Sequence, residues 1–252
     1  MARKIAQVMT GSPALEKSCA HIQRQDPLML LIMGQSNAAN HGDGVGSDVP
    51  LSVMHEGRCY STASPLPGGT GKGAALWSQL GSELQVDLDG RPLLVGLIAV
   101  EATSIKQWLG AEPLAVHWRS KLAEMLAAGL RPDLVLWQQG ESDAKLGTTE
   151  ADYGQALQLL RQELNRVGVR APMMVALSTH CPGVNGMAVR SGIQAAGAKE
   201  AGIIVGPDTD SLQGVFRSGG CHFSASGVRQ AARLWASSLR AAGLTSKAAS
   251  QP

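Results

Sequence analysis

Five short apolar runs are spread along the chain, and each is followed by glycine or by polar side chains. They cover residues 28–33, 93–100, 134–137, 173–177 and 203–205. Uninterrupted apolar runs of this length are typical of parallel strands that are covered on both faces. The pattern therefore predicts five buried parallel strands.

Helical patterns fill the intervals between these runs. They cover residues 74–84, 114–128, 151–167 and 187–200, and a last helix follows at 225–240. In that last helix, the apolar residues Val228, Ala231, Ala232, Trp235 and Leu239 fall on one face. Alternating strands and helices predict a parallel sheet between two helical layers. We expect an α/β fold, a flavodoxin-like three-layer α/β/α sandwich with a five-stranded parallel sheet.

The other segments carry weaker patterns. Residues 40–73 are rich in glycine, proline and serine, and so long a loop in a compact domain commonly covers an active site. We expect one domain at residues 26–245. Residues 1–25 are expected to form a mobile N-terminal segment and residues 246–252 a C-terminal tail.

Composition narrows the classes of protein. The chain has 252 residues, 44% of them hydrophobic and 17% charged, which suits one globular domain. A net charge of +2 with scattered basic residues argues against nucleic acid as a partner. The apolar runs are far shorter than the roughly 20 residues that span a bilayer, so no membrane partner is expected.

The beginning of the chain and its cysteines bear on location. Met1 to Lys4 are partly basic, but polar residues interrupt the segment 5–20, and no signal-peptide core is visible. We expect a cytoplasmic protein, or a secreted one if a leader has been removed. The four cysteines, Cys19, Cys59, Cys181 and Cys221, are even in number but too widely spaced to indicate a disulfide framework. Their pairing and the oligomeric state stay open.

Two residues far apart in the chain point to nucleophilic catalysis. Ser36 follows the first apolar run and Gly34, so it lies at the carboxyl edge of the sheet, where open α/β sheets bind ligands. His222 lies in the loop before the last helix. A serine nucleophile needs a base within hydrogen-bond reach, whatever the separation in sequence. The structural alternatives are a helix N-cap for Ser36 and a half-buried loop residue for His222.

A third cluster follows the third apolar run. It consists of Gln138, Gln139, Gly140, Glu141, Ser142 and Asp143. An amide can donate to a developing oxyanion, and a carboxylate can orient a histidine. Alternatively, Ser142 or Asp143 caps the next helix and Glu141 is solvated, and for Asp143 we favour capping.

Four short blocks resemble the motifs of one superfamily. They are Gly-Gln-Ser-Asn at 34–37, Thr-Ser-Ile-Lys-Gln-Trp at 103–108, Trp-Gln-Gln-Gly-Glu-Ser-Asp at 137–143 and Cys-His-Phe-Ser at 221–224. In this order they resemble the SGNH hydrolases, and more narrowly the branch of sialate O-acetylesterase-like proteins and carbohydrate esterase family 6. The resemblance implies an SGNH-type fold and an esterase that removes acetyl or other short acyl groups from a carbohydrate or related small ester, without metal or cofactor.

The resemblance also implies roles for single residues. Ser36 is the nucleophile and His222 its general base. The oxyanion hole consists of the backbone N–H groups of Ser36 and Ala102 and the side chain of Gln139. Ala102 stands where the family usually has glycine, so its methyl group narrows the approach.

The family typically has an aspartate three residues before the histidine, and this chain has Gly219 there. Another group must therefore orient His222. Glu141 is our first candidate, since it follows a strand that ends at the same edge as Ser36. Asp208 and Asp210 come next, and a backbone carbonyl near Ser218 would leave a Ser-His dyad.

Other interpretations are weaker. The missing aspartate also suits a non-catalytic carbohydrate-binding relative with a degraded triad. Residues 68–73 resemble a phosphate-binding loop only in part, because Leu66 and Gly73 stand at positions that the motif requires to be Gly and Ser or Thr. His180, Cys181, Cys221 and His222 are possible zinc ligands, but their spacing matches no common zinc pattern.

Overall fold

A single eight-stranded sheet forms the centre of the protein in the computed structural model, which describes residues 1–8, 15–44 and 50–245. Its order is β1 (Leu15–Lys17), β4 (Arg58–Thr62), β3 (Leu51–His55), β5 (Leu93–Ala99), β2 (Leu28–Gly34), β6 (Leu134–Gln138), β7 (Met173–Leu177) and β8 (Ile203–Asp208). The six strands β3, β5, β2, β6, β7 and β8 are parallel to one another. At one edge of the sheet, β4 pairs antiparallel with both β3 and β1.

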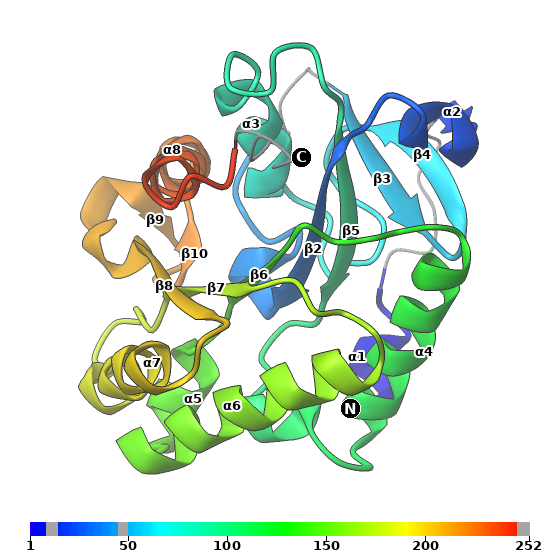
Figure 1. Ribbon diagram of the computed structural model, residues 1–252. Coiled ribbons are helices and arrows are strands. Elements are labelled where there is room, and N and C mark those ends of the chain that lie inside the picture. Colours follow the sequence, from blue (N-terminus) through cyan, green and yellow to red (C-terminus); the bar gives the residue numbers. More distant parts are fainter. Residues whose placement is uncertain (9–14, 45–49, 246–252) are drawn as a thin grey trace.

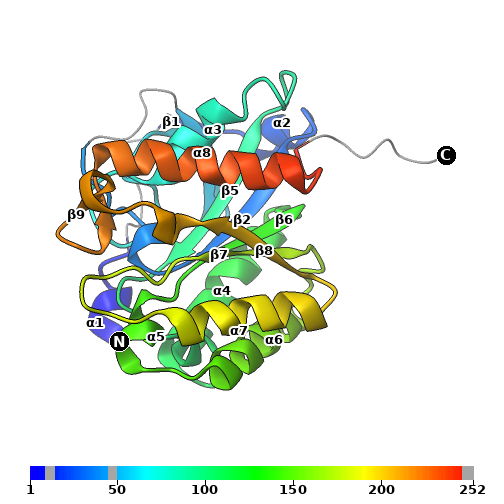
Figure 2. The same ribbon diagram turned by 90° about the vertical axis from the view of Figure 1, so that its left-hand side faces the viewer.

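Helices cover both faces of this sheet (Figure 1). The helices α3 (Leu76–Glu83) and α8 (Ala225–Ala241) pack on one face, and α4 (Pro113–Ala127), α6 (Glu150–Arg166) and α7 (Met187–Lys199) pack on the other. Figure 2 shows the same layers from the side, with α8 above the strands and α6 and α7 below them. The predicted three-layer α/β/α sandwich is confirmed.

The sheet is larger than the five strands that we predicted. All five predicted strands are present, but β3 and β4 form a hairpin inside the segment that we expected to be one long loop. Each strand has only five residues, in which apolar and polar side chains are mixed, so no apolar run marks them. The prediction of an irregular segment is wrong for residues 51–62.

Alternation along the central strand β2 supplies both cores. Leu30 and Ile32 face the layer of α3 and α8, whereas Leu31 and Met33 face α4, α6 and α7, and all four are fully buried. Side chains of a strand point to opposite faces in turn, so an apolar strand packs against two helical layers at once.

Residues 1–25 contain α1 (Ala2–Ile5), β1 and α2 (Cys19–Gln23). A disulfide joins Cys19 to Cys59 in β4, and Lys4 Nζ donates to the carbonyl of Ala102 (2.8 Å). The described part of this segment is attached to the domain by these contacts and by the pairing of β1 with β4. The mobility that we expected of residues 1–25 stays a prediction. The predicted tail at 246–252 lies outside the described residues.

Among the helices that the structure describes, none is long and apolar enough to cross a membrane.

Candidate active site

The turn after β2 places Ser36 at the carboxyl edge of the sheet. Gly34 has a φ of +147°, and a Cβ there would lie 2.1 Å from the carbonyl oxygen of Gln138, so only glycine fits. The backbone N–H of Gln35 donates to the same carbonyl (3.1 Å). A short 3₁₀ turn, Ser36–Ala38, follows directly.

A pocket of about 290 Å³ opens at this edge. It is lined by Gln35, Ser36, Glu101, Ala102, Glu141, Ser142, Lys145, Cys181, Gly219, Cys221 and His222. Residues from opposite ends of the chain, Ser36 and His222, thus share one small cavity. Ala102 and Glu141, which the sequence also singled out, line it as well.

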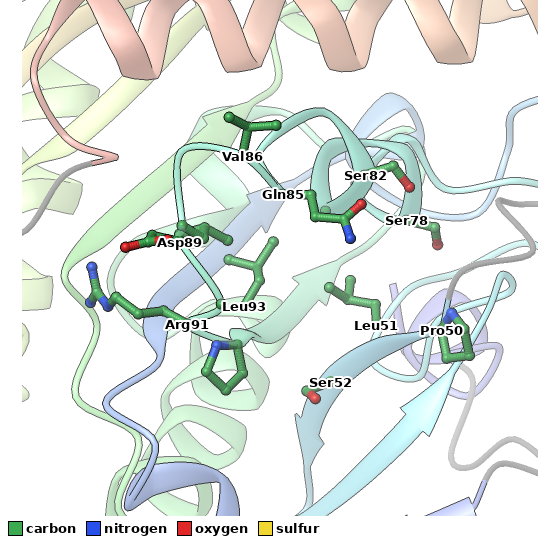
Figure 3. A pocket seen from close by; sticks show the side chains of 14 residues that line it. Pro50, Leu51, Ser52, Ser78, Ser82, Gln85, Val86, Asp89, Arg91 and Leu93 are labelled. Carbon is green, nitrogen blue, oxygen red and sulfur yellow. The ribbon is translucent and has the colours of Figure 1, made fainter.

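A larger cavity of about 620 Å³ lies at the opposite end of the parallel strands, where β3 and β5 begin (Figure 3). Leu51 and Leu93, the first residues of β3 and β5, lie at its floor, and Gln85, Asp89 and Arg91 come from the chain after α3. It contains none of the residues that the sequence singled out, so its size alone does not make it the functional site.

A small hairpin carries His222. The strand β10 (His222–Phe223) pairs antiparallel with β9 (Arg217–Ser218), which Figure 2 shows at one end of the molecule. A disulfide of 2.03 Å joins Cys221, the residue before His222, to Cys181 after β7. The imidazole therefore sits on a cross-linked strand and not on a free loop.

Two further groups hold this hairpin through one carbonyl oxygen. The carbonyl of Cys221 accepts hydrogen bonds from the Arg217 guanidinium (2.8 Å) and from Asn37 Nδ2 (3.1 Å). Asn37 follows Ser36 directly, so this second bond connects the turn of Ser36 to the strand of His222. Contacts of this kind fix the relative positions of side chains that come from distant parts of the chain.

The surroundings of His222 favour its neutral form. Burial lowers the pKa of the imidazole, the charge of Glu101 acts in the opposite direction, and Lys145 and Arg217 lower the pKa further. A pKa below the ordinary value leaves the ring unprotonated at neutral pH, as a general base requires.

Ala102 has the backbone conformation that explains why glycine is usual at this position. Its φ is +49°, in the left-handed region that residues with a Cβ adopt at a cost. Ala102 and Ser36 both line the pocket. The role of both N–H groups in an oxyanion hole stays a prediction.

Gln139 is fully buried and already engaged. Its Nε2 donates to the carbonyl of Thr103 (2.8 Å), to Asp143 Oδ2 (2.6 Å) and to Gln35 Oε1 (3.2 Å). Its Oε1 accepts a hydrogen bond from Tyr153 (2.9 Å). Gln139 thus links the chain segments that follow β2, β5 and β6. Its predicted role as an oxyanion donor stays a prediction, and that role requires the amide to leave these partners.

Gln35 presents the amide that sequence reasoning missed. Its Oε1 accepts from the backbone N–H of Ser142 (3.2 Å), which can only donate, so the orientation of the amide is determined. Among the described residues, Gln35 Nε2 has no acceptor, and the residue lines the pocket beside Ser36. Only its place next to the serine could have indicated it.

Glu141 lines the pocket and is buried, so it is not solvated. Its Oε1 accepts hydrogen bonds from Asn37 Nδ2 (2.5 Å) and Ser178 Oγ (3.0 Å), while Oε2 has no partner within the described part of the chain. Burial raises its pKa to about 7, against the effect of these bonds. These contacts do not include His222, so its role in orienting the imidazole stays a prediction.

The other acids are held elsewhere. Asp143 is buried inside α5 (Glu141–Leu146), where it accepts from the N–H of Ile105 (2.8 Å), so the capping that we favoured for it is wrong. Asp208 and Asp210 both bind Arg190, at 2.8 and 2.9 Å. Neither aspartate lines the pocket of Ser36.

The disulfide removes the thiolates from the zinc hypothesis, because Cys181 and Cys221 are bonded to each other. Within the glycine-rich residues 68–73, Thr70 contacts the end of β5 and His41. The backbone N–H of Thr70 donates to the carbonyl of Ala99 at the end of β5 (3.0 Å). Its Oγ1 lies 3.1 Å from His41 Nε2.

Sequence reasoning also missed His41 and Glu101. His41 Nε2 lies 3.4 Å from Glu101 Oε2, and the ring centroids of His41 and His222 are 5.2 Å apart. Neither residue belongs to the four motif blocks. A signal existed only for Glu101, which directly precedes Ala102 at the end of an apolar run.

No protein-family model matches the chain, and no curated protein matches it in sequence. Solved structures do match its fold. A protein from Arabidopsis thaliana is 20% identical with a TM-score of 0.69, over 85% of this chain and 98% of that one. NanS is 14% identical with a TM-score of 0.63, over 86% and 97%.

A third solved structure is a carbohydrate acetylesterase from Xanthomonas citri, which is 16% identical with a TM-score of 0.58, over 84% of this chain and 55% of that one. A putative GDSL-like lipase from Parabacteroides merdae also shares the fold, with a TM-score of 0.58. The expected SGNH-hydrolase type of fold is therefore confirmed.

Proposed function

We propose that this chain is a serine carboxylic ester hydrolase that removes short acyl groups, acetyl above all, from a carbohydrate or related small ester. The observation that carries the proposal is the pocket of about 290 Å³ shared by Ser36 and His222. A hydroxyl, a neutral imidazole and backbone N–H groups at the end of parallel strands are the parts that acyl transfer requires.

In the proposed mechanism, the Ser36 hydroxyl attacks the ester carbonyl while His222 accepts its proton. The N–H groups of Ser36 and Ala102 donate to the oxyanion. Gln35 Nε2, which belongs to a residue that lines the pocket, is the proposed side-chain donor. The imidazolium of His222 then protonates the leaving alkoxide, which leaves the acyl group on Ser36. Water, activated by His222, hydrolyses this acyl-enzyme and regenerates the serine.

The size of the pocket supports a small acyl group. Its volume of about 290 Å³ is at the lower end of the range for small-molecule sites, and Ala102, Cys181 and Cys221 line it together with Ser36. The fold shared with a carbohydrate acetylesterase supports a sugar as the alcohol. The mechanism itself needs no metal and no organic cofactor.

The proposal is tested by the release of acetate from acetylated sugars and of nitrophenol from 4-nitrophenyl acetate. Ser36→Ala is expected to abolish turnover with an unchanged circular dichroism spectrum, because only the nucleophile is removed. A serine-reactive phosphonate should add its mass to Ser36 in the native chain. Sugar binding without hydrolysis would instead favour a non-catalytic carbohydrate-binding protein.

A further inference from the structure

The histidine of the proposed site has no acid where the usual triad would place one. Gly219, three residues before His222, has no side chain, and nothing lies within 4 Å of the position that a Cβ would take there. Glu141 binds Asn37 and Ser178, and Asp208 and Asp210 bind Arg190. A different carboxylate must face the imidazole if the histidine is to be stabilised as it takes up a proton.

Glu101 is such a carboxylate. It lines the same pocket as Ser36 and His222, and its side chain is about one-third exposed (34%). Of the acids around His222, it exerts the largest charge effect on the ring; Asp43 adds a smaller one, and the cations Lys145 and Arg217 oppose both. The end of the central strand β5 positions it, because Val100 donates its backbone N–H to the carbonyl of Gly34 (3.0 Å).

His41 holds Glu101 in this place. Its Nε2 lies 3.4 Å from Glu101 Oε2, while Thr70 Oγ1 accepts from the backbone N–H of Glu101 (2.9 Å) and contacts the same Nε2 (3.1 Å). The ring of His41 also meets His222, with ring centroids 5.2 Å apart and the planes tilted by 36°. Burial lowers the pKa of His41. A neutral His41 leaves the negative charge of Glu101 uncancelled.

From this geometry we propose that Glu101, held by His41, takes the place of the missing triad acid as the positioning residue of His222. The inference rests on the proposed esterase function. The carboxylate stabilises the imidazolium that forms when His222 accepts the Ser36 proton, and the adjacent ring of His41 restricts how the imidazole turns. Both effects lower the barrier to acyl transfer, and both act through His222.

The first test is Glu101→Gln, which keeps the shape of the side chain and removes its charge. The kcat should fall roughly a hundredfold with little change in KM. That loss is below the ~10⁴ known for a buried triad acid, because this carboxylate is partly exposed. The acid limb of the pH profile of kcat/KM should move to lower pH, since His222 loses a stabilising charge.

A matched control is Glu56→Gln, which removes the carboxylate of another His–Glu pair. Glu56 lies in the β3–β4 turn, outside the pocket. Its Oε1 lies 3.9 Å from His55 Nε2 and 2.9 Å from Lys121 Nζ. Its kcat and pH profile should match those of the native chain. Equal kinetics in the two Gln variants would overturn the inference.

Rescue separates positioning from a merely structural role. Gly219 has a φ of +57°, which aspartate tolerates better than most residues, and open space around it. Gly219→Asp should raise the kcat of the Glu101→Gln chain at least tenfold, because it supplies a carboxylate at the usual triad position. If the double variant is no faster than Glu101→Gln and the pH profile has not moved, the inference fails.

A readout that does not depend on turnover distinguishes failure of the inference from failure of the proposed function. The His222 ring signal, identified by its absence in His222→Gln, is titrated by NMR in the native and Glu101→Gln chains. Its pKa should fall in the variant. An unchanged pKa overturns the inference even in an active esterase, whereas a fall in pKa in a chain that hydrolyses no ester supports the electrostatic link and refutes only the esterase.

Discussion

The buried carboxyl group of Glu141 makes the stability of the protein depend on pH. Its pKa rises from an ordinary 4.5 to about 7 on folding, so between these values the folded chain holds a proton that the unfolded chain releases. Its contribution to stability is thus complete below pH 4.5 and is lost as pH rises through 7, by about 1.4 kcal/mol for each pH unit between the two pKa values.

Glu141→Gln should remove this dependence. We expect its free energy of unfolding, measured in urea at pH 5, 6, 7 and 8, to be flatter than that of the native chain. The variant should gain stability relative to the native chain from pH 5 to pH 8. Parallel curves would show that the carboxyl group ionises at an ordinary pH.

Ala102 allows a second prediction at single-residue scale. Its φ of +49° costs a residue with a Cβ roughly 1 kcal/mol, while glycine costs a similar amount through the unfolded state. Ala102→Gly should therefore change the free energy of unfolding by less than about 1 kcal/mol and hydrolyse esters at least as fast, since the methyl group leaves the pocket.

Ala102→Val is the matched opposite change. A β-branched residue at positive φ should cost about 1–3 kcal/mol, seen as a lower urea midpoint. Equal stability of the Gly and Val variants would mean that the backbone at this position is not held in the left-handed region.

Sequence reasoning finds at residue scale what local pattern encodes. Ser36 and His222 each stand where a pattern changes, after a strand and before a helix, and they share a pocket. Glu101 and His41 are single polar residues whose meaning lies in what surrounds them in space. Neither spacing nor periodicity reveals such neighbours.

At the scale of elements, the two disulfides form a natural pair for comparison. Cys19–Cys59 and Cys181–Cys221 each join residues 40 apart, so the loss of either should lower the free energy of unfolding by a similar amount, about 2–4 kcal/mol. Only the second disulfide lines the pocket, through Cys181 and Cys221, and Cys221 directly precedes His222.

We therefore predict that the double serine variant at 181 and 221 loses both stability and kcat. The double serine variant at 19 and 59 should lose stability alone. Urea unfolding and ester hydrolysis, followed at one temperature, measure the two effects separately. Equal kcat in the two variants would show that the cross-link does not hold His222 in place.

The elements themselves are predictable in proportion to their length. The predicted helices at 114–128, 151–167 and 187–200 match α4, α6 and α7 to within about a residue at each end, because long apolar stripes leave little choice. The hairpin of β3 and β4 could not be predicted, because its five-residue strands contain neither an apolar run nor a regular alternation of apolar and polar residues. The packing of β3 against β5 forms it, and that contact is not local.

At the scale of the whole molecule, the paired cysteines bear on where the protein works. The cytoplasmic location stays a prediction, but disulfides persist mainly in oxidising compartments. Alkylation of the purified chain followed by intact-mass measurement should find no free thiol among the four cysteines. Four alkylated cysteines in protein taken from its native host would instead support the cytoplasm.

Ser36, the proposed nucleophile, follows the central strand β2, which occurs early in the chain, and His222, its proposed base, lies beyond β8, the last strand of the sheet along the chain. A ribosome must therefore synthesise the chain beyond residue 222 before the proposed site can assemble. After dilution from urea, ester hydrolysis would therefore return later than the circular dichroism signal of the helices. The time at which activity returns would report when α8 packs onto the sheet.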